Sequence, residues 1–240
     1  MIKIFTDIEE FKTYVSKSSL DININDLINL DFSFFESHDK YALISVPDYS
    51  ETPENIILMS KDYCYVFSNK NFNNYDKYFK NVLKKSYGES TVITLVLLKN
   101  ILKNYSQQFE KIRIQMNSLD INPELERIEF SGRDLRKLTD RFEELVRLII
   151  TLKEKEVKEF DTKLITFEYD LLNAEARYWL ERCRSHVYRI ASLRTKSEMQ
   201  SNRELNATMK RLTVIMTFLT IVGIVVSVPG TIGAVFGIPA

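Results

Sequence analysis

The sequence predicts an α+β protein: an N-terminal α/β domain, then long stalk helices that continue into a C-terminal transmembrane helix. Three observations support this prediction. Short β-favouring runs lie between residues 41 and 68, and helical spacing dominates after residue 120. No charged residue occurs from Leu212 to Ala240. The chain therefore divides into residues 1–120, 121–160, 161–211 and 212–240.

Composition excludes several classes of function. Lys+Arg and Asp+Glu both number 33, and this neutrality argues against a nucleic-acid partner. There is no glycine-rich phosphate loop and no Ser-His-Asp set, so we expect neither an enzyme nor a tightly bound cofactor. The cysteines and histidines are isolated, and no metal-ligand motif can be identified from the residues Cys64, Cys183, His38 and His186.

Residues 1–120 are expected to form a cytosolic α/β domain. The runs 41–46, 55–60 and 62–68 favour strands, and Lys61-Asp62 predicts a tight hairpin between the last two. Helical spacing occurs over 7–19, 75–87 and 90–119. A sheet covered by helices follows from this alternation.

Residues 121–160 are expected to form a helical hairpin arm. Asn122 as N-cap and Pro123 at the first helical position predict a helix start. The apolar residues that follow step by three and four, as in a packed seam: Leu135, Leu138, Phe142, Leu145, Ile149 and Leu152. The charged run KEKEVKE predicts a break near 155–160.

Residues 161–211 are expected to form a long stalk helix. A second seam with the same spacing comprises Phe160, Leu164, Phe167, Leu171, Ala174 and Tyr178. Such seams fit an ordinary helical hairpin or a coiled coil equally well. Between Arg194 and Asn206 the only large apolar residues are Met199 and Leu205, which suits a helix that borders a hydrated space.

The uncharged segment 212–240 predicts a transmembrane helix, since about 20 apolar residues span a bilayer. Lys210 and Arg211 immediately before it favour a cytoplasmic location for the preceding part. The N-terminus has no basic region followed by an apolar one, so we expect no signal peptide.

Hydroxyl residues of this segment share one helical face. Their steps of 4, 3, 7 and 4 place them within an arc of about 80°, and Asn206 and Met209 extend the same face; they are Thr213, Thr217, Thr220, Ser227 and Thr231. Two interpretations stay open. The hydroxyls bond their own helix and pack on a neighbouring helix, or they face a water-filled axis and bind the water shell of a hard cation.

Gly223, Gly230 and Gly237 recur every seven residues beside this face, which favours close packing of helices in lipid. Pro229 leaves the backbone oxygen of Val225 without a partner and permits a bend. Because one helix cannot enclose a pore, a pore would require an oligomer.

The stretch LNATMKRLTV (205–214) resembles the start of the first membrane helix of the CorA magnesium channels, which typically reads L-N-x-x-M-K-x-L-T. The runs YALISVP and ENIILMSKDYCYVFS are similar to paired strands of that family. The resemblance implies a homopentamer in the cell membrane, with the lipid bilayer and further copies of the chain as its partners. It also implies Mg²⁺, Co²⁺, Ni²⁺ or Zn²⁺ as the transported ion and as a possible regulatory ion.

Carried over by position, the resemblance assigns Asn206, Met209, Leu212 and Thr213 to the inner neck of the pore. The complete expected pore lining adds Thr217, Thr220, Ile224, Ser227 and Thr231. The counterpart of the family's outer Gly-Met-Asn signature is Gly237-Ile238-Pro239, which has no Asn and leaves the choice of ion open. Gly223 and Gly230 are assigned to helix packing.

The family has a second membrane helix with a basic tail, whereas this sequence stops at Ala240. We therefore expect a truncated chain or a partial gene product. The alternative function is a membrane-anchored coiled-coil scaffold, for which a single span serves only as a tether.

Overall fold

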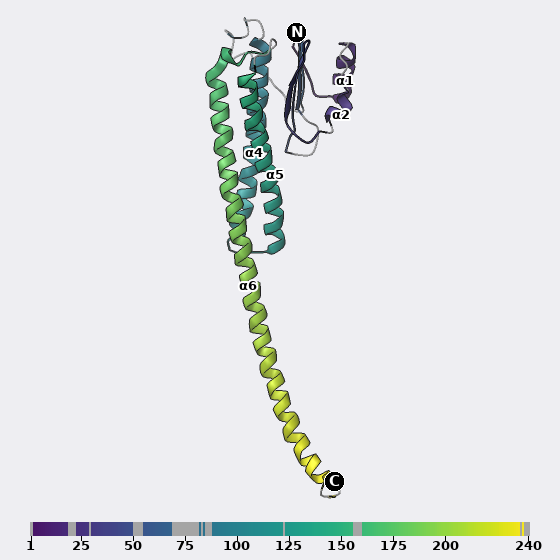
Figure 1. Ribbon diagram of the computed structural model, residues 1–240, viewed down its shortest axis with the longest axis vertical. Helices are drawn as coiled ribbons and strands as arrows, with labels where there is room; N and C mark the ends of the chain where they lie inside the picture. Colours follow the sequence, from purple (N-terminus) through teal and green to yellow (C-terminus); the bar gives the residue numbers. More distant parts are fainter. Residues whose placement is uncertain are drawn as a thin grey trace.

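The computed structural model describes residues 2–18, 23–28, 30–49, 55–68, 82, 84, 88–121, 123–155, 160–235 and 237. A small sheet and three long helices lie side by side at one end of the molecule. The last helix continues far beyond them and curves toward the C-terminus (Figure 1).

The sheet has five strands in the order β1-β5-β4-β3-β2. All neighbours are antiparallel except β1, which pairs with β5 in parallel. The predicted strands and the hairpin after Met59 are confirmed, whereas β1 and β2 were not predicted. The strands are β1 (Ile2–Phe5), β2 (Phe34–Ser37), β3 (Ala42–Val46), β4 (Asn55–Met59) and β5 (Cys64–Phe67).

Both faces of the sheet are covered, which explains why every position of its central strands is buried and most of them are apolar. Alternate residues such as Ile57 and Met59 join the core under the long helices. Their neighbours Ile56 and Leu58 pack with Phe11 and the short helices, α1 (Ile8–Lys17) and α2 (Ile24–Ile28). The sheet is therefore a middle layer between helices, as expected (Figure 1).

The long helices are α4 (Gly88–Leu119), α5 (Leu125–Glu154) and α6 (Thr166–Val235), with the short 3-10 helix η1 (Thr162–Ile165) before α6. The predicted seam of α5 is confirmed, since each of its six residues is at most 1% exposed. Phe142 in this seam meets the ring of Tyr105 from α4, with 5.5 Å between ring centroids.

Two predictions about the helices are wrong in detail. Helix α5 starts at Leu125 with Glu124 as its N-cap, so Pro123 precedes the helix; Asn122 lies outside the described residues. The α6 seam lies on a different face: Tyr169, Leu172, Ala176, Leu180 and Cys183 are buried, whereas Phe167, Leu171, Ala174 and Tyr178 are exposed. The first set packs with α4 and α5 in the core, and the Tyr169 hydroxyl donates to the backbone oxygen of Thr91 in α4 at 3.1 Å.

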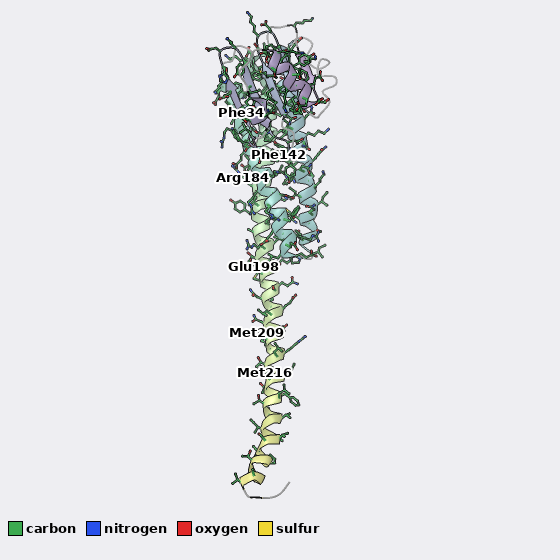
Figure 2. All side chains as sticks on the ribbon, turned by 90° about the vertical axis from the view of Figure 1, so that its right-hand side faces the viewer. Phe34, Phe142, Arg184, Glu198, Met209 and Met216 are labelled. Carbon is green, nitrogen blue, oxygen red and sulfur yellow. The ribbon has the colours of Figure 1, made fainter. Side chains whose placement is uncertain are left out.

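The bundle ends where the α4–α5 turn holds α6. Arg189 pairs with the carboxylate of Asp120, and the Lys196 ammonium donates to the backbone oxygen of Asp120 at 2.9 Å. The Ser197 hydroxyl donates to the backbone oxygen of Pro123 at 3.1 Å. From Glu198 onward, the side chains of α6 contact no other described element, as the bare lower helix in Figure 2 shows.

The chain breaks between α5 and α6 as predicted, because α5 ends at Glu154 and η1 begins at Thr162. The expected helix over 75–87 falls almost entirely outside the described residues. The predicted domain boundaries at residues 120, 160 and 211 stay a prediction. Helices α4, α5 and α6 pack together as one bundle, so the packing does not separate the chain at these positions.

Candidate functional site: the polar face of the C-terminal helix

Helix α6 is both long and, at its C-terminal end, apolar. It has 70 residues, which corresponds to about 105 Å at 1.5 Å per residue. Its apolar window has a mean hydropathy of 2.3 and is 0% buried, so by length and composition this helix could cross a membrane. The complete exposure distinguishes it from the core helix of a soluble protein, which is buried by its own chain.

All residues predicted to line a pore lie on this exposed part of α6. Eight of them share one stripe along the helix, and Leu212 lies beside it; the eight are Asn206, Met209, Thr213, Thr217, Thr220, Ile224, Ser227 and Thr231. Met209 is 57% exposed and Ile224 is 56% exposed. None of the other described residues covers the stripe, so it is open to lipid or to another molecule.

Each hydroxyl of the stripe uses its hydrogen within the helix. Thr213 donates to the backbone oxygen of Met209 at 2.9 Å, and Thr217 donates to that of Thr213 at 2.8 Å. Thr220 and Thr231 donate four residues back at 2.8 and 2.7 Å, and Ser227 donates three residues back at 3.3 Å. The hydroxyl oxygens therefore keep free lone pairs and act as acceptors.

An acceptor of this kind matches the outside of a hydrated cation. The waters of Mg²⁺ turn their oxygens to the ion, so their hydrogens point outward and need acceptors. The same internal hydrogen bonds would also let the helix lie against lipid or another helix. The geometry is thus compatible with a hydroxyl face that lies against lipid or another helix and with one that lines a water-filled axis. Access of water to the hydroxyl face distinguishes the two.

No other described residue packs closely against Gly223 or Gly230 of α6. A Cβ atom at Gly223 or Gly230 would meet nothing within 4 Å. Gly237 follows the end of α6 with a φ of 63°, in the left-handed region that favours glycine. Ile238 and Pro239, the other members of the expected outer-mouth counterpart, lie outside the described residues.

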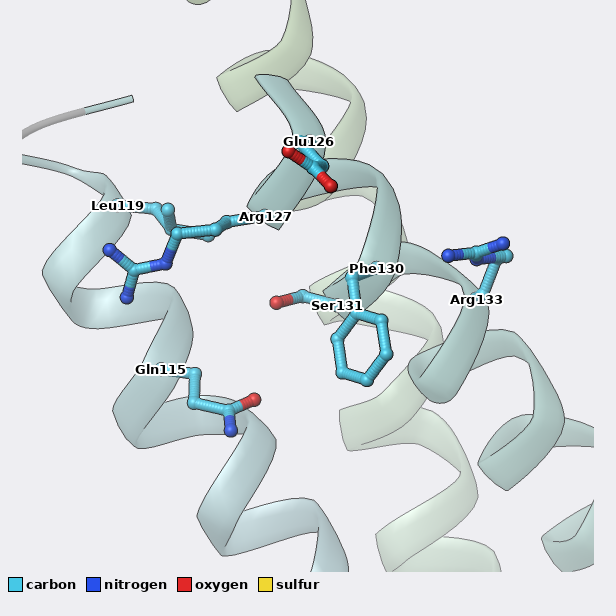
Figure 3. A pocket seen from close by; sticks show the side chains of 7 residues that line it. All are labelled: Gln115, Leu119, Glu126, Arg127, Phe130, Ser131 and Arg133. Atoms are coloured by element: carbon cyan, nitrogen blue, oxygen red, sulfur yellow. The ribbon is translucent and has the colours of Figure 1, made fainter. Parts of the chain in front are cut away.

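A separate pocket of 260 Å³ lies between the ends of α4 and α5. Figure 3 shows Gln115 and Leu119 on α4 facing Arg127 on α5. Two arginines and one glutamate line it, so its charge does not suit a cation. Among the described residues no group of three or more His, Cys, Asp or Glu side chains could hold a metal ion.

The sequence did not identify the contacts that hold α6 at the end of the bundle. Arg189 and Asp120 are 69 residues apart, and Ser197 and Pro123 are 74 apart. No local pattern links such distant positions. These contacts matter for the site because they fix the point at which the exposed part of α6 leaves the bundle.

No model of a known protein family matches the chain, and no curated protein matches it either. Several solved structures, however, are similar to the chain. The full-length CmaX protein is 12% identical with a TM-score of 0.67, over 93% of this chain and 75% of that one. The CorA magnesium transporter of Methanocaldococcus jannaschii is 16% identical with a TM-score of 0.61, over 100% of this chain and 79% of that one.

The cytoplasmic domain of ZntB from Vibrio parahaemolyticus is 10% identical with a TM-score of 0.63, over 85% of this chain and 87% of that one. The likeness to CorA includes α6, because it extends over the whole of this chain. The chain therefore has the CorA-like fold: an N-terminal sheet domain, long stalk helices and one long apolar C-terminal helix.

Proposed function

We propose that several copies of this chain assemble in a membrane as a channel for hydrated divalent cations, with Mg²⁺ the first candidate. The observation that carries the proposal is the uncharged polar stripe on an apolar helix that no other part of the described chain covers. The CorA-like fold supports it, because a magnesium transporter has this fold.

The proposed assembly is a homopentamer in which α6 of each copy turns its stripe, Asn206 to Thr231, toward a common axis. Gly223 and Gly230 would let the α6 backbones of adjacent copies approach closely in lipid. In this proposal the sheet and the bundle lie in the cytoplasm, which Lys210 and Arg211 favour by the positive-inside tendency.

Conduction in this proposal needs no protein charge in the membrane. The hydroxyl oxygens accept hydrogen bonds from the ion's water shell, so the ion passes without losing its waters. The membrane potential supplies the driving force: moving a divalent cation across 100 mV releases a free energy of about 4.6 kcal/mol.

The test compares positions on and beside the stripe. Thr213→Cys, Thr217→Cys and Thr220→Cys should react with a charged, water-soluble thiol reagent in proteoliposomes, and the reaction should block Mg²⁺ influx. Val214→Cys and Ile221→Cys are the matched controls. They are 69% and 55% exposed in one chain, so in the membrane their protection comes from lipid or from a neighbouring copy.

Equal protection of all five cysteines from the reagent would contradict the pore. It would favour the scaffold whose span is only a tether, because such a span is surrounded by lipid on every side. Reaction of the three stripe positions alone, with loss of influx, would support the channel.

A further inference from the structure

A second pocket, with a volume of 360 Å³, lies in the groove between α5 and α6. This volume is in the range of small-molecule sites, about 300 to 1,000 Å³. Glu126 and Arg133 also line the smaller pocket of Figure 3. Most lining residues recur every three or four positions and form one stripe on each helix: Glu129, Gly132, Arg133 and Arg136 on α5, and Val187, Ile190, Ala191 and Arg194 on α6.

The floor of this pocket is apolar. Ile128 and Leu135 of α5 are 1% and 0% exposed, and Ile190 of α6 is 8% exposed. A Cβ atom at Gly132 would lie 3.2 Å from a methyl carbon of Ile190, so the two helices approach closely at this level. An apolar group that enters the pocket is therefore removed from water.

At one end of the pocket the lining charges offset each other. Helices α5 and α6 are antiparallel, and Gly132 lies beside Ile190. Arg194 is therefore level with Glu129, about one turn away. The Nε atom of Arg194 also donates to the carboxylate of Glu198 at 3.0 Å. This guanidinium thus has carboxylates of its own chain around it.

The other end of the pocket carries two guanidinium groups. Arg133 and Arg136 are exposed and lie one turn apart on α5. Among the described residues neither forms an ion pair, and Arg133 lies 5.9 Å from the centre of the Phe130 ring. Asp140, one turn beyond Arg136, does not line the pocket. Two cations beside an apolar floor complement a ligand that has an acid group and an apolar body.

The ligand that fits best carries a single negative charge. Glu126 and Glu129 line the pocket as well and would repel a polyphosphate. A planar carboxylate matches a guanidinium, which can donate two parallel hydrogen bonds to it.

The position of the pocket favours a soluble ligand over a membrane lipid. Ala191 precedes Leu212 by 21 residues, which is about 30 Å along α6. The head-group layer of a bilayer is only about 5 to 8 Å thick on each side. A lipid head group therefore does not reach the pocket.

We propose that the pocket between α5 and α6 binds a small, soluble organic monocarboxylate with an apolar body. The carboxylate pairs with Arg133 and Arg136, and the body lies on the apolar floor. The ligand touches both helices before the point at which α6 leaves the bundle at Ser197. This binding does not rest on the proposed channel, because all the lining residues belong to one chain.

Fluorine NMR of the full chain in detergent, with para-(trifluoromethyl)benzoate as the probe, tests the proposal. Protein-free micelles give the contribution of the detergent, and para-(trifluoromethyl)benzyl alcohol is the uncharged analogue. The chain should bind the benzoate saturably and about tenfold more tightly than the alcohol, because only the benzoate pairs with the guanidinium groups.

Three variants examine the pocket residues. Arg136→Gln should raise the dissociation constant of the benzoate about fivefold and leave that of the alcohol unchanged. Arg177→Gln removes an exposed arginine of α6 outside the pocket and is the matched control, which should change neither value. Ala191→Phe puts a ring into the pocket and should abolish saturable binding of both probes.

The proposal fails if the chain takes up no more benzoate than the micelles do. It also fails if the alcohol binds as tightly as the benzoate, or if Arg136→Gln binds the benzoate as tightly as Arg177→Gln. The channel is judged separately from the particle mass. A particle of one chain that binds the benzoate as expected would remove the channel proposal and leave the pocket.

Discussion

Arg141 of α5 holds the segment before β2 against the bundle. Its guanidinium donates to the backbone oxygen of Asp31 at 2.7 Å and lies 3.4 Å from the carboxylate of Glu144. Glu144 also accepts from the backbone nitrogen of Ser33 at 3.0 Å. The side chain of Arg141 is 5% exposed, so these polar contacts are made largely away from water.

Replacing Arg141 by Met should lower the free energy of unfolding by about 2 kcal/mol, because the partly buried Glu144 carboxylate loses its cation. Chemical denaturation measures the change. Arg136→Met, at an exposed position of the same helix, is the control and should change stability by less than about 0.5 kcal/mol. Equal effects of the two substitutions would show that the Arg141 contacts do not stabilise the fold.

The two cysteines should be inert in the folded protein. Burial raises the pKa of the Cys64 thiol and of the Cys183 thiol to about 12. Because the thiolate is the reactive form and both pKa values lie far above pH 8, a maleimide should label neither residue at that pH. Mass spectrometry before and after unfolding in urea checks this, and rapid labelling of the folded chain would contradict the burial.

For individual residues, the sequence predicts only features formed by residues that are close together along the chain. The hydroxyl stripe from Thr213 to Thr231 is visible in the sequence because all its members lie on one helix. The Arg141–Asp31 pair joins positions 110 residues apart, and no spacing rule connects them. Whether the stripe lines a pore depends on other copies of the chain, which neither the sequence nor a single chain contains.

Helix α6 offers a direct comparison of its two faces at adjacent residues. Leu172 is 0% exposed and Leu171 is 51% exposed. Leu172→Ala should destabilise the packing of α6 on α5 by about 3 kcal/mol and increase hydrogen exchange in α5. Leu171→Ala should leave exchange in α5 unchanged, since its side chain points away from the bundle.

The readout is the exchange rate of amides in the buried part of α5, measured by mass spectrometry. If Leu171→Ala also increased this rate, the orientation of α6 in the bundle would be incorrect. The pair is matched in residue type, helix and size of the deletion, so the difference reports burial alone.

Elements with strong periodic patterns were predictable, and short or ambiguous ones were not. The α5 seam and strands β3, β4 and β5 were recognised. Strand β1 has four residues and pairs in parallel with β5, more than 60 positions away, so its sequence alone carries a weak signal. For α6 the sequence contained two apolar faces, and the choice between them depended on α4 and α5.

The molecule combines a sheet and a bundle of three helices with a long C-terminal part of α6 that the other described residues leave uncovered. Between Ser197, the last contact with the α4–α5 turn, and Leu212, α6 crosses about 22 Å without support. In the described part of a single chain, neither the polar nor the apolar stripe of this helix has a partner. The proposed assembly of several copies would supply both partners, with water beside the polar stripe and protein beside the apolar one.

The most direct test of this account is the mass of the detergent-solubilised particle, measured by light scattering with the detergent contribution subtracted. The account predicts a particle of five chains of 28.2 kDa each. A particle of one chain, stable at all protein concentrations tested, would contradict it, because one α6 cannot enclose a path for ions.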